Sequence, residues 1–310
     1  MTILLLESLH PEAEALLAGA GEIVRAKDPN APDCDFGAVR AILTRGRGRI
    51  PDALLARCPA LRVVARAGVG LDNLDTAAAA RRGIPVVFAP GGNSLTVAEH
   101  TLALVLDLVR GITRSANQAA AGRWEDRGSY AGNEIRGLVL GVLGFGAIGQ
   151  RVAKLADAFG MRVVVLAHRD RSVPAPYEAA SLPDVLRVAD VVTLHLPLTP
   201  ATKGLLGANE LAAMKAGAFL VNTARGALID GVALRAALAA GRLGGFAADV
   251  LEQEPPAPND PLLRDGRVLL TPHVASLTAL TYRAMCVDTA RNVAAILRGE
   301  SPDARSLFRG

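Results

Sequence analysis

The apolar positions of this chain fall into short runs of strand length that alternate with stretches of helical periodicity. Up to residue 90, two such stretches carry proline in their first turn, a common helix start. Regular alternation of strand and helix is typical of a parallel sheet with helices on both faces. The expected strands are residues 3–6, 22–25, 41–44, 63–65 and 86–88, and the expected helices are 11–20, 51–57 and 76–82.

The alternation resumes in the second half of the chain. The expected strands there are residues 139–143, 162–167, 191–195, 219–223, 245–250 and 268–271. Six strands in two halves match the doubly wound fold that binds dinucleotides beyond the carboxyl ends of its strands. Polar residues that follow these strands are therefore the first candidates for a functional site.

Two further helical stretches bear on the organisation of domains. Residues 96–110 are apolar nearly all round, which predicts burial on several faces. The helix should lie in the core between domains, and burial against a second subunit is an added alternative. After the sixth strand, a helical stripe should pack back on the first domain, because the second sheet is already complete. Its apolar residues are Leu280, Ala284, Val287, Ala290, Ala294 and Leu297.

We therefore expect an α/β protein of two doubly wound parallel-sheet domains. A Rossmann dinucleotide-binding domain, residues 96–275, is inserted into a flavodoxin-like substrate domain made of residues 1–95 and 276–310. The hinges should lie near 90–97 and 274–280, with the cleft between the two lobes.

A glycine fingerprint, Gly144-Phe145-Gly146-Ala147-Ile148-Gly149, lies between an expected strand and an expected helix. The first glycine allows a tight turn, the second lets the backbone approach a pyrophosphate, and the third lets the helix pack close to the strand. An ordinary strand–helix turn is the alternative. Because both flanking elements are present, we interpret all six residues as cofactor-binding.

The end of the second nucleotide strand favours NADP(H) over NAD(H). An NAD site holds the ribose hydroxyls with an acid about 20 residues past the glycines. Here that strand runs into Ala167-His168-Arg169-Asp170-Arg171, and a guanidinium can pair with a 2′-phosphate. We assign His168 and Arg169 to the cofactor site. Asp170 is the counter-argument, since a small shift of the turn would bring it to the ribose.

Three consecutive strands deliver polar residues to one sheet edge. Arg225 follows the fourth strand, Glu254 the fifth and His273 the sixth. Reduction of a 2-keto acid needs a cation for the carboxylate and carbonyl, a proton donor, and an anion that keeps the donor protonated. We take these residues as the catalytic set. Glu252 is a rival carboxylate and His195 a rival histidine, although His195 ends the third strand and should line the cofactor.

The first domain carries a candidate anion turn, Arg66-Ala67-Gly68-Val69-Gly70, at a strand end. The basic segment Arg45-Gly46-Arg47-Gly48-Arg49 follows the preceding strand. An arginine there could hold the far end of a substrate. The segment could equally be a solvated basic loop. We expect a short 2-keto acid with a polar or anionic tail and not a branched apolar one.

Composition narrows the remaining possibilities. The 310 residues suffice for two domains, and the net charge of +4 is scattered except at residues 45–49, which argues against a nucleic-acid partner. Cys34, Cys58 and Cys286 lack CxxC spacing, as expected for free thiols. The N-terminus has no basic region of a signal peptide, and no apolar run could span a membrane. We expect a cytoplasmic protein without a metal ion in its site.

These motifs resemble the D-isomer-specific 2-hydroxyacid dehydrogenases, most closely the D-3-phosphoglycerate dehydrogenase branch. The resemblance runs from about Arg45 to Thr278. It includes the anion turn continued to Asn73, residues 93–99, the glycine fingerprint, Asn222-Thr223-Ala224-Arg225-Gly226, and residues 271–276. Two features depart from the family. The chain has the short form, without the regulatory C-terminal domain of many phosphoglycerate dehydrogenases, and the expected acid of the second nucleotide strand is missing.

The resemblance implies that Arg225, Glu254 and His273 are catalytic and that Asp249 contacts the nicotinamide amide. It also implies backbone N–H groups of Gly68 and Val69 on the substrate carboxylate, and a homodimer formed largely through the nucleotide domain. The further residues that we assign to the cofactor site are His195, Pro197, Thr202, Thr223 and Ala224. Those assigned to the substrate are Arg45, Arg66 and Asn93.

Two classes of function remain open. The first is an NAD(P)-dependent oxidoreductase acting on a small 2-keto acid, either as a phosphoglycerate dehydrogenase or with the specificity of a hydroxypyruvate or glyoxylate reductase. The second is a cofactor-sensing binding protein like the family's transcriptional corepressors. The Arg/Glu/His set favours the first, but such corepressors resemble the enzymes even at these positions.

Overall fold

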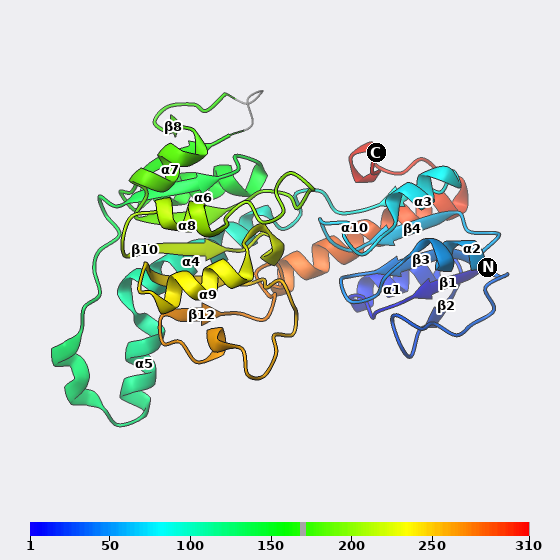
Figure 1. Ribbon diagram of the computed structural model, residues 1–310. Coiled ribbons are helices and arrows are strands. Elements are labelled where there is room, and N and C mark those ends of the chain that lie inside the picture. The colour runs from blue at the N-terminus through cyan, green and yellow to red at the C-terminus, as the bar shows by residue number, and fades with distance from the viewer. Residues whose placement is uncertain (168–171, 310) are drawn as a thin grey trace. The chain divides into compact units, whose positions relative to one another are not determined.

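The structure, a computed structural model, describes residues 1–167 and 172–309 (Figure 1). It divides into two compact units, a first of Met1–Asn93 with Leu277–Gly310 and a second of Ser94–Ser276. Each unit is built around one parallel sheet, and the second unit is inserted into the chain of the first. The predicted fold class is thereby confirmed. None of the helices in the described part of the chain has the length and apolar character needed to cross a membrane.

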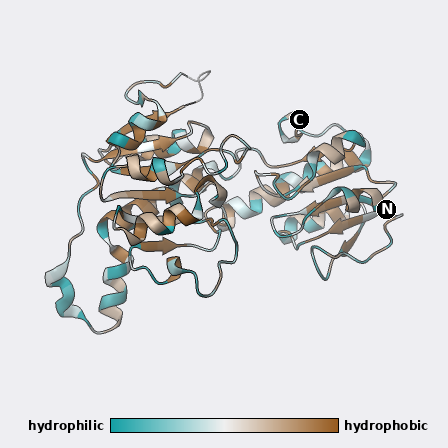
Figure 2. Cartoon of the chain, viewed as in Figure 1, coloured by the Kyte–Doolittle hydropathy of each residue, from teal (hydrophilic) through white to brown (hydrophobic). Residues whose placement is uncertain are grey.

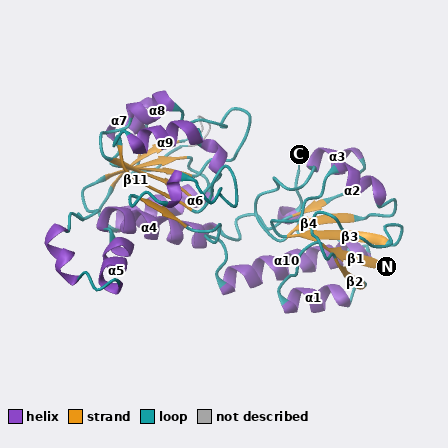
Figure 3. Cartoon of the chain, turned by 60° about the horizontal axis from the view of Figure 1, so that its bottom comes forward, coloured by secondary structure: helices purple, strands orange, loops and turns teal. Residues whose placement is uncertain are grey.

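The first unit has a five-stranded sheet in the order β2-β1-β3-β4-β5. This is the flavodoxin-like order, whose direction reverses between β1 and β3. The strands are β1 Thr2–Leu5, β2 Glu22–Arg25, β3 Val39–Thr44, β4 Val63–Arg66 and β5 Val86–Val87. The helices are α1 Pro11–Ala18, α2 Asp52–Arg57, α3 Thr76–Arg81 and α10 Ala279–Arg298. Helices α2 and α3 cover one face of the sheet, and α1 and α10 cover the other (Figure 3).

Helix α10 packs on the first unit, as its apolar stripe predicts. Val287, Ala290 and Leu297 are buried in one cluster with side chains of α1, β1, β3 and β4. The stripe does not begin where the sequence pattern places it, because Leu280 is 82% exposed. The helix ends at Arg298, and the Arg62 guanidinium donates to the carbonyls of Ile296 and Leu297, at 2.9 and 2.7 Å.

The second unit has a seven-stranded sheet in the order β12-β11-β10-β9-β6-β7-β8, with all described pairs parallel. Its direction reverses between β6 and β9. The six predicted strands are present, as β6 Val139–Leu143, β7 Arg162–Leu166, β9 Val191–Leu194, β10 Ala218–Asn222, β11 Leu243–Ala248 and β12 Val268–Leu270. The seventh, β8 Glu178–Ala179, was missed because this two-residue edge strand is exposed and has no apolar pattern.

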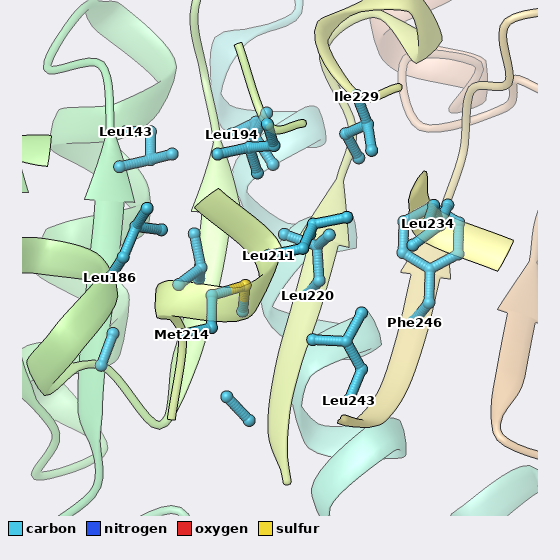
Figure 4. Packing of buried hydrophobic residues seen from close by; sticks show 14 of the residues in the cluster. Leu143, Leu186, Leu194, Leu211, Met214, Leu220, Ile229, Leu234, Leu243 and Phe246 are labelled. Atoms are coloured by element: carbon cyan, nitrogen blue, oxygen red, sulfur yellow. The ribbon is translucent and has the colours of Figure 1, made fainter. Parts of the chain in front are cut away.

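Helices α7, α8 and α9 cover one face of this sheet, and α4 and α6 cover the other (Figure 3). Their bounds are α4 Ser94–Arg110, α5 Ile112–Ala120, α6 Ala147–Ala158, α7 Leu182–Val188, α8 Ala208–Ala213 and α9 Gly231–Ala239. The strands of both sheets consist mainly of hydrophobic residues (Figure 2). Figure 4 shows leucines of β6, β9 and β10 meeting leucines of α7, α8 and α9 in one buried cluster.

Helix α4 is buried mainly against its own unit, where it packs on α6, β10 and β11. Helix α5 differs, since none of its residues is buried although its polar and apolar residues are segregated. Ile112 of this helix is 57% exposed, and Trp124 and Tyr130 in the following segment are 66% and 51% exposed. This segment therefore presents large apolar side chains to its surroundings.

Candidate active site

The glycine loop after β6 uses each glycine for a different physical reason. Gly144 has φ 103°, which residues with a side chain rarely adopt, and a Cβ there would lie 2.5 Å from the carbonyl oxygen of His195. A Cβ on Gly149 would lie 2.0 Å from the Gly144 carbonyl oxygen, so this glycine lets α6 approach the loop. At Gly146 a Cβ would meet no atom within 4 Å. The space above Gly146, at the N-terminus of α6, fits a pyrophosphate.

The other residues of the fingerprint face different surroundings. Phe145 is only 4% exposed and packs edge-on against the ring of Tyr177 at 5.9 Å, so its side chain belongs to the core and only its backbone can serve a cofactor. Ala147 is exposed and Ile148 half-buried in the first turn of α6. His168 and Arg169, on which the preference for NADP(H) depends, lie outside the described residues.

His195 follows β9, whose neighbour in the sheet is β6 and where the strand order reverses. Its Nε2 lies 3.0 Å from the hydroxyl of Thr193, and its Nδ1 is buried without a hydrogen-bond partner among the described residues. Burial lowers the pKa of His195 to about 3, so the ring is neutral near pH 7. A neutral ring with an unused polar atom suits a residue that lines a cofactor and not one that donates protons.

Three further residues assigned to the cofactor have partners within the second unit. Thr202 donates to the carbonyl of Pro197 at 2.7 Å and closes the loop after His195. The hydroxyl of Thr223 lies 2.8 Å from that of Thr101, which itself donates to the carbonyl of Val97. Because a hydroxyl has one proton to give, Thr223 donates to Thr101 and thereby ties β10 to α4.

The structure brings Glu254 and His273 together. His273 Nδ1 lies 2.7 Å from Glu254 Oε2, and Glu254 Oε1 accepts the N–H of Leu251 at 2.9 Å. His273 adopts φ 56°, unusual for a residue with a side chain, and its N–H donates to the carbonyl of Thr271 at 2.9 Å. Since Nδ1 faces the carboxylate, Nε2 is the ring atom left for a substrate.

Electrostatics in this pair favour a charged histidine. The hydrogen bond that His273 donates to Glu254 raises the pKa of His273, although burial and the charge of Arg225 oppose the rise. Burial raises the pKa of Glu254, but the bonds from His273 and from the N–H of Leu251 outweigh it, and the net pKa is lowered. The rival Glu252 is exposed and makes no such pair in the described chain.

Arg225 is held at the end of β10 by a residue that the sequence analysis left without a role. Asn222, which is fully buried, donates from Nδ2 to the carbonyl of Arg225 at 2.8 Å and accepts the N–H of Ala224 at 2.9 Å. The guanidinium donates to the carbonyl of Ala224 at 2.7 Å. Its charge lowers the pKa of both Glu254 and His273, so it lies within electrostatic range of the pair.

Asp249 is buried at the end of β11 and bonds to the turn that carries His273. It is 2% exposed, and its Oδ1 accepts the hydroxyl of Thr271 at 2.5 Å and the N–H of Val274 at 2.8 Å. Its Oδ2 accepts the N–H of Ala275 at 2.8 Å. Both oxygens therefore hold the turn that carries His273, and His100 Nε2 also contacts Thr271, at 3.0 Å.

The candidate substrate residues of the first unit are also engaged in part. Arg66 donates from Nε to the carbonyl of Arg45 at 2.6 Å and from Nη1 to the carbonyl of Gly70, so its guanidinium holds two loops together. The N–H of Gly68 donates to the carbonyl of Arg66 at 2.8 Å, which leaves Val69 as the better candidate for a substrate carboxylate. The amide oxygen of Asn93 has no hydrogen-bond partner among the described residues.

Arg45 is the arginine of this group with a half-exposed side chain, at 36%. Its guanidinium carbon lies 5.0 Å from the centre of the Tyr282 ring. Its Nε lies 3.9 Å from Oε1 of the buried Glu7. The side chain of Arg45 is therefore more exposed than that of Arg66, which is 15% exposed.

Comparisons with known proteins agree with this architecture. Residues 102–275 match the family described as D-isomer specific 2-hydroxyacid dehydrogenase, NAD binding domain. The chain is 41% identical over 271 residues to a glyoxylate reductase of Aeropyrum pernix, with 84% of this chain and 81% of that protein covered. It is 36% identical over 307 residues to a D-3-phosphoglycerate dehydrogenase of Methanocaldococcus jannaschii, covering 96% of this chain but 58% of that protein.

Solved structures give the same result over the whole chain. A Thermus thermophilus protein of 37% identity has a TM-score of 0.92, with 100% of both chains covered. An NADPH-dependent glyoxylate/hydroxypyruvate reductase of Sinorhizobium meliloti has 29% identity and a TM-score of 0.89, covering 100% of this chain and 98% of that one. The chain belongs to the D-isomer-specific 2-hydroxyacid dehydrogenase family.

Proposed function

We propose that this protein is an oxidoreductase that transfers a hydride between NAD(P)H and the C2 carbonyl of a small 2-keto acid, giving a D-2-hydroxy acid. The hydrogen-bonded pair of Glu254 and His273 carries the proposal. A charged histidine of raised pKa, held by a carboxylate, is what a proton donor near neutral pH requires.

Each residue of the site has a separate role in the proposed reaction. A nicotinamide cofactor, held through the glycine loop at residues 144–149, would supply the hydride for C2. Arg225 binds the substrate carboxylate and polarises the carbonyl with its planar donors. His273 gives the Nε2 proton to the carbonyl oxygen, so that C=O becomes CH–OH, and then regains a proton from solvent. Glu254 holds Nδ1 and stabilises the imidazolium before transfer, while Asp249 fixes the turn beneath the histidine.

For the substrate we propose a short 2-keto acid with a polar or anionic tail. Relatives named as phosphoglycerate dehydrogenases support 3-phosphohydroxypyruvate. The Aeropyrum pernix relative supports glyoxylate as the alternative, and the Sinorhizobium meliloti reductase supports glyoxylate or hydroxypyruvate. Arg45 supports the anionic tail, because its half-exposed guanidinium is available beside a fixed loop. The N–H of Val69 is the proposed donor to the substrate carboxylate.

For the cofactor we propose NADP(H) ahead of NAD(H), on the sequence Arg169-Asp170-Arg171 and the absence of an acid at the end of β7. We also propose a homodimer. Its support is α5 and the segment after it, which expose the large side chains of Ile112, Trp124 and Tyr130.

The alternative is a cofactor-sensing binding protein on the same fold. A turnover assay separates the two, with glyoxylate, hydroxypyruvate, 3-phosphohydroxypyruvate and 2-ketoisocaproate tested against both reduced cofactors. His273→Ala should lower kcat by about 10²-fold or more with cofactor binding nearly intact. His195→Ala, the same change at the rival histidine, is the matched variant for comparison with His273→Ala. A wild type without turnover, or a His273→Ala variant as active as wild type, would overturn the proposal.

A further inference from the structure

A buried carboxylate in the first unit has no role in the proposed chemistry. Glu7 follows β1, and its side chain is 3% exposed. Its Oε2 accepts the backbone N–H groups of Arg45, Gly46, Arg47 and Gly48, at 2.9, 2.8, 3.0 and 3.1 Å. The hydroxyl of Thr44 lies 2.9 Å from the same oxygen. Successive N–H groups that converge on one oxygen form an anion nest, and Glu7 fills it.

The nest holds a full negative charge. Burial raises the pKa of Glu7, but the N–H groups of Gly48, Gly46 and Arg45 and the Thr44 hydroxyl outweigh it and bring the pKa to about 2. The second oxygen, Oε1, lies 3.9 Å from Arg45 Nε and 3.8 Å from Arg47 Nε. One carboxylate therefore fixes the loop backbone and also attracts the two arginines that follow β3.

The position of this nest in the sheet points to a ligand. Strands β1 and β3 are neighbours, and the sheet order reverses between them. In open α/β sheets, ligands bind outside the carboxyl ends of the strands at such a reversal. Because an internal carboxylate already occupies the backbone N–H groups, an external anion must be bound by side chains. Arg45 is the best placed, held by Glu7 on one side and by the Tyr282 ring on the other.

We propose that Glu7 is a positioning residue for substrate recognition: its carboxylate fills the nest of residues 45–48 and holds Arg45 where the guanidinium binds the anionic tail of the substrate. The inference rests on the proposed function for the identity of the substrate. Glu7 thereby contributes to the selectivity for an acid with a phosphate tail over one with a neutral tail.

The test compares two ligands that differ in the tail, 3-phosphoglycerate and D-glycerate, by titration calorimetry on the full chain. Glu7→Gln keeps the shape of the side chain but removes its charge. It should weaken 3-phosphoglycerate at least about tenfold more than D-glycerate, since a charge-assisted contact is lost. Steady-state kinetics should show the same selectivity in KM and not in kcat. Glu22→Gln, the same change at an exposed position of β2, should leave both ligands unaffected.

A double variant identifies the residue through which Glu7 acts, because affinity losses that share one cause do not add. Arg45→Gln should show the same selective loss, and the double variant should be no worse than Arg45→Gln alone. Losses that multiply in the double variant, or an equal loss for both ligands in Glu7→Gln, would overturn the inference.

A glycine pair tests the loop without changing its charge, and serves if Glu7→Gln does not fold. A Cβ on Gly48 would lie 2.7 Å from Leu6 Cβ and 2.9 Å from the Thr44 hydroxyl, whereas one on Gly46 would meet nothing within 4 Å. Gly48→Ala should therefore reproduce the selective loss and Gly46→Ala should not. Equal behaviour of the two variants would contradict the role of the nest.

The outcome also separates this inference from the proposed function. If the phosphate-tailed ligand binds with these ratios but no 2-keto acid is reduced, the proposed function fails and the inference stands. If the wild type reduces glyoxylate but binds 3-phosphoglycerate no better than D-glycerate, the inference fails and the proposed function stands.

Discussion

Replacement by alanine should have different effects at two glycines of the fingerprint, Gly149 and Gly146. At Gly149 a Cβ would lie 2.0 Å from the Gly144 carbonyl oxygen, so α6 or the loop must move by about 1 Å, an overpacking that costs about 1–3 kcal/mol. Alanine recovers part of this, up to about 1 kcal/mol, through its higher helix propensity. A net loss of about 2 kcal/mol lowers the Tm of a unit of this size by about 4–8 °C.

At Gly146 the same methyl group meets no protein atom, and the backbone, with φ −79° and ψ −165°, is extended and open to any residue. Gly146→Ala should therefore change the free energy of unfolding by less than about 0.5 kcal/mol. The methyl would instead occupy the space that the pyrophosphate needs. Cofactor affinity should fall at least about tenfold, which corresponds to about 1.4 kcal/mol.

Thermal unfolding of the cofactor-free protein and fluorescence titration with NADH and NADPH measure the two effects separately. Gly266→Ala, where a Cβ also meets nothing within 4 Å, is the control and should change neither quantity. The reasoning is refuted if Gly146→Ala melts as low as Gly149→Ala while it binds the cofactor as tightly as the wild type.

Three further predictions concern the proton donor, the assembly and the cofactor. The hydrogen bond that His273 donates to the Glu254 carboxylate raises the pKa of His273, so Glu254→Gln should lower that pKa. Because reduction needs the protonated ring, kcat/KM for reduction should fall as the pH rises, and in this variant the fall should begin at a lower pH than in the wild type. Coincident pH profiles would contradict this. Light scattering at micromolar concentration should give twice the chain mass, and Trp124→Ala should weaken the dimer; a wild-type monomer would refute the role of this exposed segment. Finally, kcat/KM should be higher with NADPH than with NADH, and a tenfold preference for NADH would overturn that proposal.

Local pattern was enough to predict most of the fold. Buried parallel strands read as continuous apolar runs, and all five strands of the first sheet and six of the second lie where those runs are. The glycine loop could also be predicted, because a tight turn and a close helix approach each require glycine at a single position. Strand β8 escaped detection since two exposed residues carry no periodicity.

Sequence alone also placed Glu254 and His273 at neighbouring strand ends, because strand order in a doubly wound sheet follows from topology rules. What it could not supply is which polar atoms are already used. Both oxygens of Asp249 accept hydrogen bonds from the turn at 271–275, and its contact with a nicotinamide stays a prediction. The guanidinium of Arg66 likewise donates to two loop carbonyls, which no local pattern predicts.

Glu7 shows most clearly why hydrogen-bond partners could not be predicted from the sequence. In the sequence it is one carboxylate in a short polar stretch after the first strand, 38 to 41 positions away from the N–H groups that it accepts. Those groups converge on it only because β1 and β3 are adjacent in the sheet. The sequence by itself determined the elements and the residues that carry chemistry, since these depend on local periodicity and side-chain type. Only the tertiary structure decided which donor meets which acceptor, since hydrogen bonding is short-ranged and the partners are distant along the chain.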